Sequence, residues 1–230
     1  MDTFTIVHHL GLGDQMVMNG LVRHLSEKGK VIIIVKESNR ETVEFMYRDI
    51  NIVKIEYVKT TDPIETWSKV DRNTKVIALA TYGMETNIWE YLSHIFNWTH
   101  IPYLQAKVNP MYMYTKFRVD REHTKEDELY KKLVKGKYIF VHDQGSSNKT
   151  CINLITELDI IRPSMDIKNI FDYLKIIENA EEVHCINSSF GVMIELTGIA
   201  KGKRYLHTRV AYSNYSVATV ESVFTEWIFT

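Results

Sequence analysis

The chain has 230 residues, enough to bury a sizeable core in one large domain or in two small ones. Its 28 basic and 29 acidic side chains give a formal net charge of -1, so no overall field attracts nucleic acid or an anionic membrane. No apolar run approaches the roughly 18 residues of a membrane-spanning helix, and the N-terminus leads directly into a strand. We therefore expect a cytoplasmic protein with no membrane span and no nucleic-acid partner.

The two cysteines, Cys151 and Cys185, stand far apart in the sequence. No Cys/His spacing in the chain matches a zinc site, and two isolated thiols make no disulfide framework. The cysteine pattern thus predicts reduced thiols and no metal ligands.

The first hundred residues alternate between apolar runs and helical patterns. Strands are predicted at 4–9, 31–35, 52–58 and 76–80. The helix starts depend on capping signals, namely Asp14 after the glycines, Ser38 with Glu41, and Asp62 followed by Pro63. A further helix is predicted at 89–96. This alternation predicts a Rossmann-like lobe over residues 1–106.

The pattern changes over residues 107–136, which we interpret as a linker with a charged helix at 120–134. Alternation then resumes, with strands predicted at 138–141, 158–161, 183–186 and 204–207. Helices are predicted at 166–179, capped by Asp166, at 188–199 and at 217–228. The second half, residues 137–230, is therefore predicted to be another α/β lobe, so the chain belongs to the α/β class with two lobes.

The segment Gly11-Leu12-Gly13-Asp14 lies where the first strand ends and a helix begins. Backbone N–H groups and the helix dipole favour an anionic ligand there, although a tight turn that needs glycine is the plainer explanation. Asp14 is either a helix cap or a general base. His8 and His9 point to opposite faces of the strand, so one is expected to pack and the other to reach the ligand.

The same turn permits a different interpretation, a dinucleotide site of an oxidoreductase or epimerase. Glu37 at the end of the second strand is placed to bond a ribose. Met16 stands where the dinucleotide fingerprint has its third glycine, which counts against this alternative. A nucleotide- or glycan-binding module without catalysis is the third possibility.

Two polar segments follow predicted strands of the second lobe. Residues 142–150 concentrate hydrogen-bond donors and one cation, and residues 187–191 open a helix with free N–H groups. A solvated loop and plain capping by Ser188 are the simpler explanations. Because carboxyl ends of parallel strands form the ligand-binding edge of α/β sheets, both segments are candidate phosphate or sugar contacts.

The residues 8–14, continued by Asn19-Gly20-Leu21-Val22-Arg23, resemble the start of small glycosyltransferase-like proteins of large DNA viruses and bacterial surface-polysaccharide clusters. More distantly they resemble the heptosyltransferases. Residues 183–190 are similar to the strand and helix start that hold the donor nucleotide in that group. The chain is shorter than a heptosyltransferase, and Ser188-Ser189-Phe190 replaces the usual glycine-threonine form. These differences leave the identity of the donor open.

The resemblance implies a GT-B architecture, in which two Rossmann-like lobes face across a cleft, the first on the acceptor side and the second on the donor side. It implies an inverting transferase with a UDP- or GDP-linked sugar donor, a glycan acceptor, no further cofactor, and Asp14 as the catalytic base. The chain has no Asp-x-Asp triplet, consistent with a metal-independent reaction in which helix N-termini and Lys149 neutralise the diphosphate. Predicted acceptor contacts are His8, His9 and Asn19. Predicted donor contacts are Gly11, Gly13, His142, Gln144, Ser146, Lys149, Ser188, Ser189 and Phe190.

Overall fold

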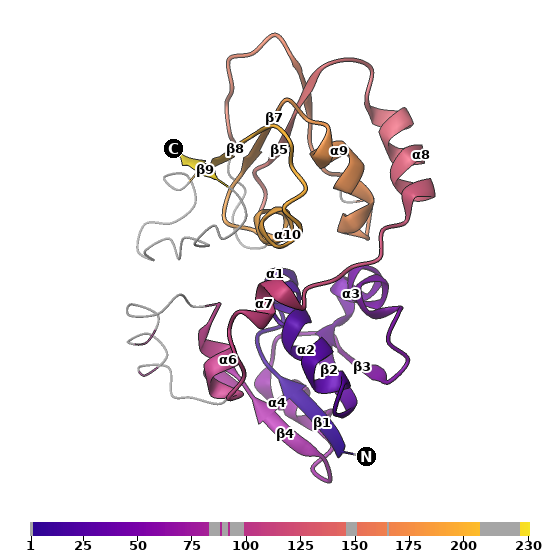
Figure 1. Cartoon of the computed structure of the whole chain (residues 1–230), viewed down its shortest axis with the longest axis vertical. Helices are drawn as coiled ribbons and strands as arrows, with labels where there is room; N and C mark the ends of the chain where they lie inside the picture. The colour runs from indigo at the N-terminus through magenta and orange to yellow at the C-terminus, as the bar shows by residue number, and fades with distance from the viewer. Residues whose placement is uncertain are drawn as a thin grey trace. The chain divides into compact units, whose positions relative to one another are not determined.

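The computed structural model describes residues 2–82, 88, 92, 99–145, 151–164, 166–207 and 226–230. The chain divides into two compact units, Met1–Asp120 and Arg121–Thr230, called unit 1 and unit 2 below (Figure 1). The division falls inside the segment 107–136. Over the described ranges, none of the helices combines the length and the apolar character needed to cross a membrane.

Unit 1 contains a parallel sheet whose strands follow the predicted apolar runs. The strands are β1 (Asp2–Val7), β2 (Gly29–Lys36), β3 (Val53–Val58) and β4 (Lys75–Ala78), in the order β3-β2-β1-β4. Their buried residues include Ile6, Val31 and Ile33, none of which has exposed surface. The chain leaves β1 for β2 on one side and returns to β4 on the other. The carboxyl ends of β1 and β4 therefore form a topological switch point, where such sheets bind ligands.

Helices connect the strands of unit 1 (Figure 1). They are α1 (Leu12–Val17), α2 (Asn19–Ser26), the 3-10 turn η1 (Glu37–Asn39), α3 (Arg40–Tyr47), α4 (Pro63–Ser68), the 3-10 turn η2 (Ala80–Tyr82), α6 (Ile101–Gln105) and α7 (Tyr112–Thr115). The predicted start of α4 is confirmed, since Asp62 accepts a hydrogen bond of 2.8 Å from the N–H of Ile64 and Pro63 occupies the first helical position. The predicted helix at 89–96 falls on residues outside the described set, residue 92 excepted.

Two other predicted caps of unit 1 are wrong. Ser38 caps nothing, because residues 37–39 form the turn η1 and α3 begins one residue later, after Asn39. Asp14 is not a cap either. The N-cap position of α1 belongs to Gly11, and Asp14 lies in the first turn of the helix.

Unit 2 also contains a parallel sheet. Its strands are β5 (Tyr138–His142), β6 (Asp159–Ile161), β7 (Glu182–Cys185), β8 (Lys203–Leu206) and β9 (Trp227–Phe229), in the order β6-β5-β7-β8-β9. The chain leaves β5 for β6 on one side and then crosses to β7 on the other. The switch point of this sheet therefore lies at the carboxyl ends of β5 and β7.

The helical segments of unit 2 are α8 (His123–Leu133), the 3-10 turn η3 (Ile170–Tyr173), α9 (Leu174–Glu178) and α10 (Ser189–Thr197). The predicted cap Asp166 is wrong. Residues 167–169 are not helical, and Asn169 caps η3 by accepting from the N–H of Phe171 at 3.2 Å. The predicted helix at 217–228 is wrong at its end, because Trp227 pairs with Arg204 as part of β9. Residues 217–225 lie outside the described set.

An aromatic cluster forms part of the core of unit 2 and connects α10 to β5. The ring of Phe190 on α10 lies 5.5 Å from Phe140 of β5 and 5.7 Å from Tyr173, measured between centroids. All three side chains are buried. Burying side chains of this size contributes about 1.5–3 kcal/mol each. The cluster fixes the start of α10 against β5, which positions the polar residues described next.

Candidate functional site

The carboxyl end of β1 in unit 1 carries the predicted histidines. His8 is buried, with 2% of its surface exposed, and its Nε2 has no hydrogen-bond partner. Burial lowers the pKa of His8 to about 3, so this imidazole is neutral. His9 is partly exposed, and its ring meets the edge of Tyr82 with 6.4 Å between centroids. The two side chains thus differ in exposure, although both lie beyond Val7, the last residue of β1, and not within the strand as predicted.

Asp14 lies close to the backbone of Gly11. A β-carbon built on Gly11 would overlap Oδ2 of Asp14, the end of a flexible side chain, so a side chain at residue 11 would displace this carboxylate. The glycine is not required by its backbone conformation, since its φ is -63°. Burial raises the pKa of Asp14, while the charge of His9 acts in the opposite direction. A carboxyl group with a raised pKa beside an imidazole is suited to accept a proton.

The neighbouring strand end in unit 1 is strained. Ala80, two residues after β4, has a φ of 54°, which side chains other than glycine rarely adopt. Gln105 holds it there, accepting from the Ala80 N–H at 2.8 Å and donating to its carbonyl oxygen at 3.4 Å. Backbone strain of this kind is common at functional sites. At the switch point of unit 1, the end of β1 is thus followed by the buried His8, and the end of β4 by the strained backbone of Ala80.

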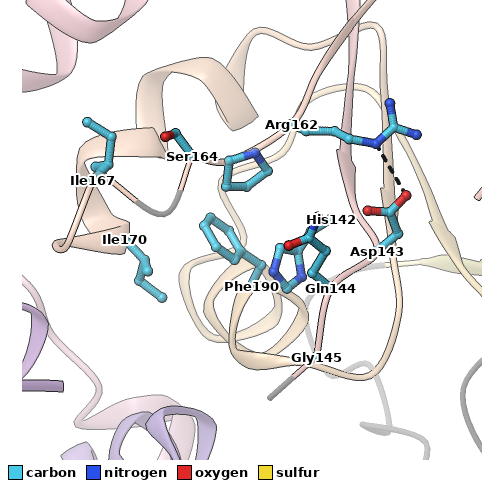
Figure 2. A pocket seen from close by; sticks show the side chains of 10 residues that line it. His142, Asp143, Gln144, Gly145, Arg162, Ser164, Ile167, Ile170 and Phe190 are labelled. Atoms are coloured by element: carbon cyan, nitrogen blue, oxygen red, sulfur yellow. Dashed lines mark hydrogen bonds and ion pairs between the residues drawn. The ribbon is translucent and has the colours of Figure 1, made fainter. Parts of the chain in front are cut away.

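Unit 2 has a cavity of about 410 Å³ at the carboxyl edge of its sheet (Figure 2). Its apolar wall consists of Pro163, Ile167, Ile170 and Phe190. Its polar side chains are His142, Asp143, Gln144, Arg162 and Ser164. Three predicted donor contacts, His142, Gln144 and Phe190, therefore line one cavity.

His142 connects this cavity to the start of α10. Its Nδ1 lies 2.8 Å from the hydroxyl oxygen of Ser188, and its ring lies 4.4 Å from that of Phe190. Burial lowers the pKa of His142 to about 4, although the charge of Asp143 acts against this shift. The imidazole is therefore neutral at physiological pH. Ser188 occupies the N-cap position of α10, but its side chain makes no capping hydrogen bond.

Arg162 and Asp143 form the second polar pair of the cavity (Figure 2). Asp143 is 4% exposed, and its Oδ2 accepts from Nε of Arg162 at 3.2 Å and from the N–H of Ile152 at 3.1 Å. Arg162 also donates to the Ile152 carbonyl at 3.1 Å. These bonds fasten the end of β5 to the residue after β6. Arg162 lines the cavity, and its side chain keeps 37% of its surface exposed.

Sequence reasoning did not identify Arg162 or Ser164 as site residues, and Asp143 lies in the candidate segment 142–150 without being singled out. A signal was present for Arg162, because it directly follows a predicted strand and carboxyl ends of parallel strands share one edge. Its buried partner Asp143 is 19 residues away in the chain. That pairing depends on the sheet order β6-β5, which no local pattern predicts.

The remaining predicted donor residues divide between the units. Gly11 and Gly13 belong to unit 1, and Ser189 is the first residue of α10 in unit 2. Ser146 and Lys149 lie outside the described residues.

The expectation that Asn19 contacts an acceptor does not fit its environment. Asn19 has no exposed surface, and its Oδ1 accepts from Nε of Arg23 and from the N–H of Arg118, both at 3.1 Å. Its Nδ2 donates to the Arg118 carbonyl at 3.4 Å. A buried amide with both ends bonded is structural, and Asn19 holds the segment at Arg118 against α2.

The residues of the dinucleotide alternative are engaged in other interactions. Met16 has no exposed surface and fills the core where the fingerprint has a glycine. The Glu37 carboxylate accepts from Nε and a terminal nitrogen of Arg40 at 2.8 and 2.9 Å. Neither arrangement resembles the glycine turn and ribose-binding carboxylate of that fingerprint. Over the described ranges, no group of three or more His, Cys, Asp or Glu side chains is placed to share a metal ion.

No protein-family model matches the chain, and no curated protein matches its sequence. Solved structures do match it. A glycosyl transferase of family 9 from Veillonella parvula DSM 2008 aligns over 100% of this chain and 86% of its own, with a TM-score of 0.61 and 9% identity. The ADP-heptose LPS heptosyltransferase II of E. coli aligns over 100% and 90%, with a TM-score of 0.50 and 7% identity. The chain therefore shares the α/β fold of these two transferases.

Proposed function

We propose that this protein is a GT-B-type glycosyltransferase that moves a sugar from a nucleotide-sugar donor to a glycan hydroxyl, with inversion and without a metal ion. The observation that carries the proposal is the cavity at the carboxyl edge of the unit 2 sheet, where His142, which is hydrogen-bonded to Ser188, and Arg162 lie beside an apolar wall. The fold shared with two glycosyl transferases supports the same class of reaction. Unit 2 would bind the donor and unit 1 the acceptor.

The cavity has the size and the chemistry that a nucleotide needs. Its volume of about 410 Å³ falls within the 300–1,000 Å³ usual for small-molecule sites. The apolar side chains around Phe190 suit a nucleobase. Arg162 suits a phosphate group, and so do the N–H groups at the start of the nine-residue helix α10. A nucleoside diphosphate thus fits both the wall and the polar edge of the site.

In the proposed reaction, Asp14 is the general base. Its carboxylate takes the proton of an acceptor hydroxyl, whose oxygen forms a bond to the anomeric carbon of the donor sugar. The bond between that carbon and the diphosphate oxygen breaks, and the nucleoside diphosphate leaves. A single displacement inverts the anomeric centre. The start of α10 and Lys149 would neutralise the charge of the leaving group in place of a divalent cation.

A thermal-shift series tests the proposal against its alternatives. UDP-, GDP- and CMP-linked sugars are compared with NAD, because a ligand that binds only the folded state raises the melting temperature. At 100 times its Kd, such a ligand adds about 2.7 kcal/mol to the free energy of unfolding. We expect a nucleotide sugar to stabilise the protein and NAD to have no effect. The converse result would favour an oxidoreductase. Binding without release of nucleoside diphosphate, tested over a panel of glycan acceptors with excess chelator, would favour a binding module.

A further inference from the structure

The two ring nitrogens of His142 face different surroundings. Nδ1 is bonded to Ser188 at 2.8 Å. Within the described part of the chain, no hydrogen bond reaches Nε2, and this atom is not among the fully buried polar atoms that lack a partner. Because the ring lines the cavity, Nε2 is left open to a ligand there.

The partner of Ser188 determines which nitrogen carries the proton. A neutral imidazole has one N–H donor and one acceptor nitrogen. When a phosphate oxygen binds at the start of α10, the Ser188 hydroxyl donates its hydrogen to that anion. Its oxygen then accepts from Nδ1–H of His142. The proton is thereby held on Nδ1, and Nε2 offers a lone pair to the cavity.

We propose that His142 is a specificity-determining residue that accepts a hydrogen bond from a ribose hydroxyl of the donor, so that the site selects ribonucleotides. This inference rests on the proposed function. An acceptor nitrogen repels phosphate oxygens and requires a donor from the ligand. Nε2 belongs to the same ring as Nδ1, the nitrogen that is bonded to Ser188, so it lies close to the proposed phosphate position. In a nucleotide the group next to the phosphates is the ribose, and its hydroxyls can donate to Nε2. The Phe190 ring, 4.4 Å away, holds the imidazole in this orientation.

The test compares UDP, GDP and ADP with their 2′-deoxy and 3′-deoxy forms by calorimetry on the full chain. Leaving an acceptor without its partner costs about 1–3 kcal/mol, so one deoxy form should bind at least about 5-fold more weakly than its parent. His142→Asn keeps an amide group near the position of Nδ1 and removes Nε2. In this variant the ratio between parent and deoxy form should fall close to one, while binding of inorganic diphosphate is unchanged.

Further variants separate the role of His142 from general effects on unit 2. In Ser188→Ala the hydroxyl that keeps the proton on Nδ1 and donates to the phosphate is gone. Both the selectivity for the ribonucleotide over its deoxy form and the binding of inorganic diphosphate should therefore weaken. His123→Asn makes the same change at an exposed position on α8 and should alter neither.

The possible failures are distinguishable. If UDP, GDP and ADP do not bind wild-type protein, the proposed function and this inference are both wrong. If a diphosphate binds and its two deoxy forms bind equally well, the inference alone is overturned. The wild-type comparison decides this point even where His142→Asn does not fold.

Discussion

The carboxylate of Asp14 occupies the space above Gly11 that a β-carbon at residue 11 would fill. The glycine at this turn therefore provides room for an acidic side chain, and its backbone angles are ones that any residue adopts. This relationship connects the glycine-rich start of the chain to the proposed base. A substitution at Gly11 can therefore displace the Asp14 carboxylate while Asp14 itself is kept.

The first prediction uses Gly11→Ala. The added methyl group displaces the Asp14 carboxylate, so the rate of sugar transfer should fall at least about 10-fold, as expected when a base loses its geometry. The melting temperature should change little, since alanine is compatible with a φ of -63°. Transfer rate and thermal unfolding are measured together. Gly136→Ala is the matched control, because a β-carbon there meets nothing within 4 Å. Normal transfer by Gly11→Ala would show that the position of Asp14 does not matter.

The pH dependence of stability tests the burial of His142. Its pKa is about 4 in the folded protein and about 6.5 when unperturbed, so the unfolded chain binds the proton more readily between these values. Stability is therefore lost as pH falls from about 6.5 to 4, with a slope of up to about 1.4 kcal/mol per pH unit from this one group. Urea unfolding of wild type and His142→Asn should differ in slope within this window. His8 contributes to both proteins alike. Parallel curves would mean that His142 is not buried as described.

Ala80→Gly tests the strain next to β4. The left-handed conformation costs roughly 1–2 kcal/mol for a residue with a β-carbon, so the glycine variant should be more stable by about 1 kcal/mol. The gain is measured by urea unfolding. Gln105→Ala removes both bonds that hold Ala80 and should destabilise the protein. A loss of stability in Ala80→Gly would mean that another contact of the methyl group outweighs the strain.

The elements that could be predicted from sequence are those fixed by local interactions. The apolar runs that form β1 to β8, and the start of α4 at Asp62 and Pro63, depend on neighbouring residues only. The predicted start of α3 at Ser38 is wrong, because Glu37 pairs with Arg40 and residues 37–39 form a 3-10 turn before the helix begins. Trp227 and Ile228, the last two residues of the predicted helix at 217–228, look helical by spacing, but they pair with β8 as part of β9.

Site residues follow the same rule. That His142 and Phe190 lie at the carboxyl edge of the sheet could be predicted, because each stands near the end of a strand or the start of a helix. Asn19 also looked available, but the segment at Arg118, distant in sequence, packs over it. Arg162 acquires its role from Asp143 across two strands. Such long-range packing determines which polar side chains face a ligand, and one sequence does not reveal it.

The most direct test of the account is the release of nucleoside diphosphate by wild type and Asp14→Asn, with the donor found by thermal shift and a glycan acceptor, in excess chelator. Removing a general base lowers turnover about 10²- to 10⁴-fold. Donor binding should persist, and the melting temperature at pH 7 should not fall, because burial that raises the pKa of Asp14 disfavours its charged form. The raised pKa also places the acid limb of the activity profile above pH 3.8. Near-normal turnover in Asp14→Asn would contradict the mechanism, and loss of turnover in chelator alone would contradict the metal-independent reaction.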